Sequence, residues 1–336
     1  MSVPESDWAE AIRLLCSHDD ISLACHVGPD GDALGSMLAL GLALRDRGCT
    51  VRASWGSEPF EVPASYASLP GLDLLVPASD IPEAPELLVT FDTGSTDRLG
   101  SLADRVATAG DVLVLDHHVT NSRFGSVNLV DESAAATAVV VVELMDRMGM
   151  ELTQQIAAPV YTGLVTDTGS FKYAATTPAV HELAARLLAT GIQHERISRH
   201  IWDTAPFAYV QLLGAACTRA AFEPDAVGGL GLVWTTVTAA DLQSFGLALS
   251  DVEGVIDSLR VAQEAEVAAV VKFDPADELL KVSIRSKGAV DVGALCEGLG
   301  GGGHRFAAGY TSRVPVDQTV AQLRSALATA PHLSTA

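Results

Sequence analysis

Apolar runs separated by amphipathic stretches dominate the first part of the chain. The runs predict strands at residues 21–25, 51–55, 87–91 and 112–115, with a further short strand at 72–76. Helical spacing predicts helices between them, at residues 8–15, 33–47 and 97–108. Strands that are apolar throughout and alternate with helices are typical of a parallel sheet buried on both faces. The pattern therefore predicts an α/β fold.

The second part of the chain begins with helices and then returns to an α/β pattern. Helices are predicted at residues 134–148, 153–165, 178–189, 193–201 and 208–220. Strands follow at 231–237, 265–273 and 279–284, with helices at 239–245, 252–259, 291–299 and 316–327. We therefore expect an N-terminal α/β domain over 1–190, a helical linker over 191–225 and a smaller α/β domain over 226–336.

The charge of the chain limits its partners. It has 42 acidic and 21 basic residues and a formal charge of −21. A protein that coats long nucleic acid needs surface Lys and Arg to neutralise phosphates, so this charge argues against that class. A small anionic substrate stays open, because bound metal ions can supply the positive charge.

Cysteines and apolar segments indicate the compartment. The five cysteines are scattered and form no CxxC pair, which is typical of free thiols in a reducing compartment. The N-terminus lacks the basic and apolar regions of a signal peptide. No apolar run approaches the ~20 residues that cross a bilayer. We expect a cytoplasmic protein with no membrane partner.

His26, Asp30 and Asp32 follow the first predicted strand. One interpretation is a Pro-Asp-Gly turn in which Asp32 caps the next helix. The other is a metal site, because the loop after the strand can direct the imidazole and the carboxylates to one point. Mixed imidazole and carboxylate ligands suit Mn²⁺ or a similar ion.

Asp92 and the tripeptide Asp116-His117-His118 end two further predicted strands. Asp92 alone is typical of a turn or a helix cap, and its alternative role is a metal ligand shared by two ions. Two adjacent histidines after an aspartate are costly to bury without a purpose. One histidine can bind metal while the other faces a substrate, with Asp116 orienting an imidazole.

Asp167 and a glycine run complete the candidate residues. Asp167 ends an apolar helix, where a carboxylate opposes the helix dipole unless a cation or a donor compensates. A Thr/Ser-rich turn is the alternative. The run Gly300–Gly303 before His304 is either a flexible linker or a packed loop whose amides approach an anion.

In this order, the motifs His-x-x-x-Asp-x-Asp, Asp, Asp-His-His, Asp and Gly-Gly-Gly-His resemble those of the DHH/DHHA1 phosphoesterases. The resemblance covers roughly residues 10–330 and is strongest to the short members, of the nano-RNase and pAp-phosphatase type. It implies an N-terminal DHH domain with a parallel sheet and flanking helices, a smaller C-terminal α/β DHHA1 domain and an active site in the cleft between them.

The resemblance also implies roles for single residues. Two Mn²⁺ ions per subunit, or Mg²⁺ or Co²⁺ instead, would be held by His26, Asp30, Asp32, Asp92, His117 and Asp167. Asp92 would bridge the two ions. Asp116 would orient a neighbouring imidazole without binding a metal ion itself, and His118 would face the scissile phosphate. The nucleotide would be held by Arg285, Gly301, Gly302, Gly303 and His304, and Arg98 is a weaker candidate for a phosphate contact.

The activity implied is hydrolysis of short oligoribonucleotides such as pApA to mononucleotides, and of pAp or cyclic di-AMP to AMP. A hydroxide activated by two metals would attack phosphorus in line. The resemblance also implies a homodimer. Alternatives within the superfamily are a RecJ-like exonuclease and an inorganic pyrophosphatase. The Gly-Gly-Gly-His run argues against the pyrophosphatase, and a catalytically silent nucleotide sensor is a third alternative.

Overall fold

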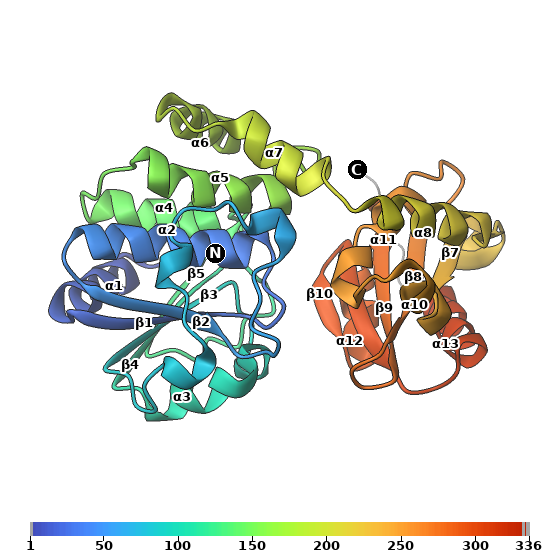
Figure 1. Cartoon of the computed structure of the whole chain (residues 1–336), viewed down its shortest axis with the longest axis horizontal. Coiled ribbons are helices and arrows are strands. Elements are labelled where there is room, and N and C mark those ends of the chain that lie inside the picture. The colour runs from blue at the N-terminus through green and yellow to red at the C-terminus, as the bar shows by residue number, and fades with distance from the viewer. Residues whose placement is uncertain (1–2, 331–332, 334–336) are drawn as a thin grey trace. The chain divides into compact units, whose positions relative to one another are not determined.

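The computed structural model describes residues 3–330 and residue 333, and the chain divides into two compact units between Thr204 and Ala205 (Figure 1). The sequence-predicted linker, 191–225, contains α7 (His194–Trp202) of the first unit. It also contains α8 (Phe207–Thr218) and β6 (Ala221–Glu223) of the second.

The first unit is built on a parallel sheet of five strands in the order β2-β1-β3-β4-β5. The strands are β1 (Asp20–Cys25), β2 (Thr50–Trp55), β3 (Leu87–Phe91), β4 (Asp111–Asp116) and β5 (Val127–Val130). Every neighbouring pair is parallel, so the carboxyl ends of all five strands lie at one edge. The α/β fold predicted from the apolar runs is confirmed.

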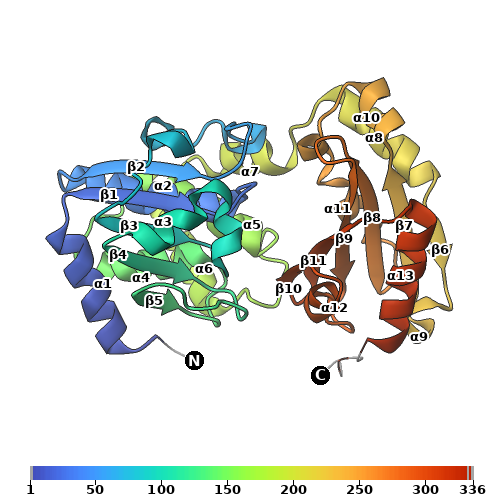
Figure 2. The same cartoon turned by 90° about the horizontal axis from the view of Figure 1, so that it is seen from below.

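Helices cover both faces of this sheet (Figure 1). The larger core packs beneath α2 (Gly31–Asp46), α4 (Thr137–Arg147) and α5 (Gln154–Asp167), and includes α1 (Glu5–Ser17) and α6 (Pro178–Ala189). A smaller core on the other face lies under the 3-10 helix η4 (Thr96–Leu102) and α3 (Ala103–Thr108), which Figure 2 shows in front of the sheet. Both faces of the strands are thus buried, as their apolar composition predicts.

Two details of the first unit differ from the sequence prediction. The strand predicted at 72–76 is wrong, because proline-flanked turns here form the 3-10 helices η2 (Leu72–Leu74) and η3 (Ala78–Asp80), after η1 (Ala64–Tyr66). The helix predicted at 97–108 is broken at Gly100, where the backbone is not helical (φ 58°). A Cβ there would collide with the carbonyl oxygen of Gly56, so the chain needs glycine at this bend.

Helices α2 and α5 approach each other so closely that glycines line their contact. A Cβ on Gly35 would collide with the carbonyl oxygen of Pro159. A Cβ on Gly163 would lie 2.6 Å from Oδ1 of Asp32. The small residues therefore fix the spacing between Asp32, at the start of α2, and Asp167, at the end of α5.

The second unit contains a mixed sheet of six strands in the order β10-β11-β9-β8-β7-β6. Its further strands are β7 (Leu232–Val237), β8 (Val267–Asp274), β9 (Leu279–Ser286), β10 (Gly302–His304) and β11 (Ala307–Ser312). Only β7 and β8 pair in parallel within it. The sequence pattern did not predict β6, β10 or β11, because these strands are short or rich in glycine and alanine.

Helices pack on both faces of the mixed sheet as well. One core lies under α12 (Val292–Gly298) and α13 (Val316–Thr329) and reaches α9 (Ala226–Gly229). The other lies under α8, α10 (Ala239–Phe245), η5 (Leu249–Val252) and α11 (Val255–Leu259). The predicted helices at 239–245, 291–299 and 316–327 are confirmed within two residues of their ends. No helix within the described residues is long and apolar enough to cross a membrane.

Candidate metal centre

The carboxyl ends of neighbouring strands bring the predicted site residues together. His26 follows β1, Asp92 follows β3, and His117 follows β4. Asp32 comes from the first turn of α2, and Asp167 is the last residue of α5. Ligands of open α/β sheets collect at this edge.

The first group of side chains surrounds the imidazole of His26. Its Nε2 lies 3.7 Å from Oδ2 of Asp30 and 3.6 Å from Oδ2 of Asp92. The imidazole and Asp92 are buried, whereas half of the Asp30 side chain is exposed. These atoms are close enough together to hold one metal ion.

The second group surrounds His117. Its Nε2 lies 3.5 Å from Oδ1 of Asp92, 3.1 Å from Oδ2 of Asp167 and 4.0 Å from Oδ2 of Asp32. Asp92 thus presents one oxygen to each histidine. Because Asp92 belongs to both groups, the two could hold neighbouring ions with one carboxylate between them.

Both histidines are oriented by the backbone. Nδ1 of His26 lies 2.9 Å from the carbonyl oxygen of Val27, and Nδ1 of His117 lies 3.1 Å from that of Ala134. When Nδ1–H donates to a carbonyl, the lone pair of the neutral ring is on Nε2. Metal-binding histidines typically have this arrangement. In each ring the nitrogen directed at the carboxylates is Nε2.

Asp30 and Asp32 each serve a helix in addition to the site. Oδ1 of Asp30 accepts from the backbone N–H of Asp32 and Ala33 and caps α2. Asp32 accepts from the N–H of Thr137 (2.5 Å) and of Ala138 (2.9 Å), at the start of α4. The expectation that Asp32 caps its own following helix is therefore wrong, since Asp30 does so. Asp32 instead fixes α4 to the site.

The backbone at Asp92 is strained. Its φ of 53° lies in the left-handed region, which is costly for a residue other than glycine. Its N–H donates to the carbonyl oxygen of Leu115, and its Oδ1 accepts from the hydroxyl of Thr137 at 2.9 Å. Strain of this kind persists where the surroundings fix it, and it clusters at functional sites.

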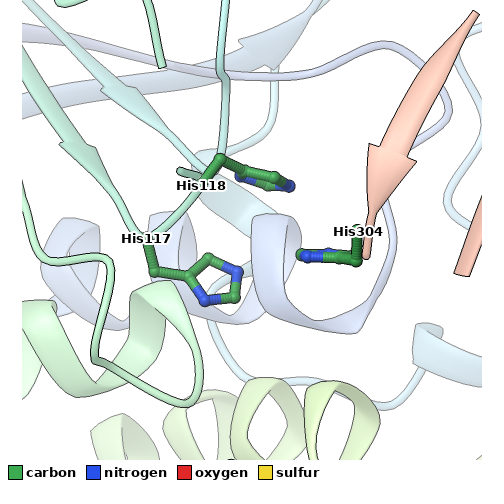
Figure 3. A group of neighbouring side chains, drawn as sticks. All are labelled: His117, His118 and His304. Carbon is green, nitrogen blue, oxygen red and sulfur yellow. The ribbon is translucent and has the colours of Figure 1, made fainter. Parts of the chain in front are cut away.

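His118 and Asp116 form a separate pair beside the second group. Figure 3 shows the rings of His117 and His118 on consecutive residues after β4. Nδ1 of His118 lies 2.7 Å from Oδ1 of Asp116, which also accepts from the N–H of His117. The amide of Asn121 donates to the other oxygen of Asp116 at 2.5 Å. Asp116 therefore organises the loop and holds the ring of His118.

Crowding of buried carboxylates shifts the pKa values of the site. Burial, followed by repulsion from Asp167 and Asp92, raises the pKa of Asp32 well above its ordinary value. Burial also raises the pKa of Asp167 to about 6, although His117 opposes the shift. Carboxylates packed so closely repel one another when ionised, and a divalent cation removes this repulsion.

The histidines compensate part of this negative charge. Burial lowers the pKa of His26, but hydrogen bonds with Asp30 and Asp92 outweigh burial and raise it to about 10. Burial also lowers the pKa of His117, but the hydrogen bond and the charge of Asp167 outweigh burial and raise this pKa well above its ordinary value. Carboxylate oxygens with imidazole nitrogens are a ligand set that Mn²⁺ accepts. The residues therefore fit a pair of divalent ions that share Asp92.

The remaining predicted residues belong to other elements of the fold. Arg98 is exposed on η4, and its carbonyl oxygen accepts from the N–H of Val27. Arg285 is half-buried on β9, opposite Ala307 of β11. His304 ends β10 (Figure 3).

The glycine run is a folded hairpin, so the linker alternative is wrong. Gly302 and Gly303 belong to β10 and pair with Gly309 and Ala308 of β11. The φ of Gly303 is 140°, and a Cβ there would lie 2.7 Å from the carbonyl oxygen of Ala307. Only glycine allows this close approach of two backbones.

Sequence reasoning did not single out Thr137 or Asn121. Thr137 is fully buried and opens a helix that is otherwise apolar in its first turns, which is the signal that could have identified it. Asn121 follows the Asp-His-His motif within a few residues, but its two acceptors are set by the loop geometry.

Comparison with known proteins identifies the family. Residues 20–164 match the model of the DHH family, N-terminal domain, and residues 235–330 match that of the DHHA1 domain. The chain is 34% identical over 97% of its length to the bifunctional oligoribonuclease and PAP phosphatase NrnA of Thermus thermophilus, of which it covers 96%. The chain belongs to the DHH/DHHA1 family. It is accordingly a phosphoesterase, as its motifs predict.

Two further comparisons cover most of the chain. The protein is 26% identical to the enzyme of the same name from Bacillus subtilis, over 89% of this chain and 91% of that one. The crystal structure of an exopolyphosphatase-related protein from Bacteroides fragilis covers 96% of each chain, with a TM-score of 0.87 and 23% identity. The second likeness supports the fold.

Proposed function

We propose that this DHH/DHHA1 phosphoesterase hydrolyses short oligoribonucleotides such as pApA to mononucleotides, with Mn²⁺ as its metal. We propose that it also hydrolyses pAp and cyclic di-AMP to AMP. The observation that carries the proposal is the position of Asp92, which presents one oxygen to His26 and the other to His117. Paired divalent metals typically serve the cleavage of phosphate esters.

The residues of the first unit have defined parts in this proposal. His26, Asp30 and Asp92 hold one ion, and Asp32, Asp92, His117 and Asp167 hold the other. When bound, two such ions lower the pKa of water and neutralise charge that develops on the phosphate. Thr137 holds one oxygen of Asp92, so the shared carboxylate keeps its orientation.

His118 is the proposed residue that faces the scissile phosphate. Its Nδ1 is held by Asp116, and the proposed contact with the substrate is made by its Nε2. The bond to Asp116 raises the pKa of His118 although burial opposes the rise. A protonated ring can contact the phosphate or give a proton to the departing oxygen.

The second unit is proposed to hold the nucleotide. Arg285 supplies a cation, Gly301, Gly302 and Gly303 carry no side chains that would keep a ligand away from the backbone, and His304 adds a ring. Arg98 is the weaker candidate for a phosphate contact in the first unit. The acidic surface disfavours long RNA, which supports short substrates. The Thermus and Bacillus relatives are named as oligoribonucleases and PAP phosphatases, which supports the same substrate class.

One incubation tests this function. Purified protein with Mn²⁺ is mixed separately with pApA, pAp, cyclic di-AMP, a long RNA and pyrophosphate, and the products are separated. We expect AMP from pApA, slow turnover of the long RNA, and no turnover in Asp92→Asn. Turnover of pyrophosphate alone would overturn the proposal, and so would equal rates on pApA and long RNA.

A further inference from the structure

A rigid turn follows the metal-site residue Asp167. Three consecutive residues, Gly169, Ser170 and Phe171, have φ values of 55°, 57° and 64° in the left-handed region. Thr168 anchors the turn, because its hydroxyl accepts from the N–H of Phe171 and its carbonyl oxygen accepts from that of Lys172. The turn therefore presents Lys172 at a fixed place, five residues after Asp167.

Lys172 is unusual for this acidic chain. It is the only lysine before residue 272, and its side chain is exposed. Among the described residues its ammonium forms no ion pair with a carboxylate, and its Nζ lies 5.9 Å from the centroid of the Trp202 ring. A cation without a carboxylate partner, placed five residues after the metal-site residue Asp167, is suited to an anionic ligand.

Trp202 offers a flat surface beside this cation. It ends α7 and is 46% exposed, which is a large open area for an indole. The helix that carries it is anchored, because Ile197 and Ile201 pack on the larger core and Nδ1 of His200 lies 3.1 Å from the hydroxyl of Ser68. The helix end that carries the indole is therefore held in place, and the exposed ring offers a surface on which a ligand can stack.

We propose that Lys172 and Trp202 form a nucleotide subsite for the part of the substrate that is not cleaved. The nucleobase stacks on the indole, and the ammonium contacts the terminal, non-scissile phosphate. A nucleotide offers both a flat ring and an anion, so it matches both halves of the pair. Ligand entry exchanges the cation–π contact for a charge-assisted contact to phosphate. This inference rests on the proposed function and names a second recognition element for it.

Two variants separate the phosphate from the base. Lys172→Gln should raise the KM for pApA by about 10-fold and leave the KM for ApA, which lacks the terminal phosphate, within twofold. Lys172→Arg should restore most of the affinity. Trp202→Ala should raise the KM for both dinucleotides by about 10-fold, since base stacking on an aromatic ring is lost. Methyl p-nitrophenyl phosphate has neither a nucleobase nor a terminal phosphate, so the Lys172 and Trp202 variants should all hydrolyse it at the wild-type rate.

Arg186→Gln is the matched control. It removes one positive charge from the same unit at an exposed residue that pairs with Asp146, and it should leave every KM unchanged. A KM for pApA within twofold of wild type in both Lys172→Gln and Trp202→Ala would overturn the subsite while leaving the proposed function intact. If the wild type does not hydrolyse pApA, the proposed function fails. The subsite is then tested by calorimetric measurement of the Kd for pApA. A Kd within twofold of wild type in both Lys172→Gln and Trp202→Ala would overturn the subsite, and a rise of about 10-fold in each would support it.

Discussion

The hydroxyl of Thr137 donates a hydrogen bond to Oδ1 of Asp92 across 2.9 Å, although 45 residues separate them in the chain. The bond fixes the carboxylate that lies between His26 and His117. Thr137→Val keeps the shape and removes the donor. We expect its Mn²⁺ affinity to fall by about 10-fold, because loss of a residue that hydrogen-bonds to a metal ligand typically lowers metal affinity 10–100-fold. Calorimetric titration with Mn²⁺ measures this.

Thr162→Val is the matched control for this change. Thr162 is also fully buried, but its hydroxyl donates to the carbonyl oxygen of Ala158 within its own helix. Unchanged Mn²⁺ affinity is expected for it. Equal losses of affinity in the two variants would show that the effect at Thr137 comes from packing and not from Asp92.

His118→Gln separates catalysis from metal binding. The proposed role of His118 at the phosphate predicts a fall in kcat of about 10²–10⁴-fold, as for a lost acid or base. Mn²⁺ stoichiometry should stay at the wild-type value, because His117 and not His118 is the proposed ligand. His18→Gln is the control, because the Nδ1 of His18 contacts the carbonyl oxygen of Leu14, away from the Asp-His-His motif. Loss of bound metal in His118→Gln would contradict this assignment.

Binding of Mn²⁺ should release protons. In the metal-free protein the pKa of His26 is raised to about 10, so its ring carries a proton at pH 7. A metal-bound Nε2 cannot keep that proton, so affinity should rise as pH rises toward 10. Titrations in two buffers of different ionisation enthalpy measure the release. Binding heats that do not depend on the buffer would refute it.

Gly35→Ala tests the close contact of α2 and α5. The added methyl group collides with the carbonyl oxygen of Pro159, so we expect a loss of about 1–3 kcal/mol in stability and weaker Mn²⁺ binding. Gly214→Ala, in a helix with nothing near the new Cβ, should instead stabilise by roughly 0.5–1 kcal/mol. Thermal unfolding with and without Mn²⁺ compares them. A neutral Gly35→Ala would show that the two helices can separate freely.

Much of the fold and most of the candidate site could be predicted from the sequence because strand ends carry the chemistry. Asp92 and His117 directly follow the strands β3 and β4, and parallel pairing places such ends at one edge. The motif order then indicated which residues share a site. The structure brings His26, Asp30, Asp32, Asp92, His117 and Asp167 together, in two groups around the two histidines.

The rest depended on contacts between distant segments. That Asp32 caps α4 and not α2 follows from packing over 105 residues of chain, which no local pattern encodes. The strained φ of Asp92 is imposed by its neighbours and not by its residue type. The glycine hairpin was ambiguous because glycine runs suit both linkers and closely packed strands.

Anomalous diffraction from crystals grown with Mn²⁺ tests the central claim most directly. The account predicts two manganese peaks about 3.5–4 Å apart, one beside His26 and one beside His117, with a carboxylate oxygen of Asp92 bound to each. A single peak, or two peaks that do not share Asp92, would contradict it.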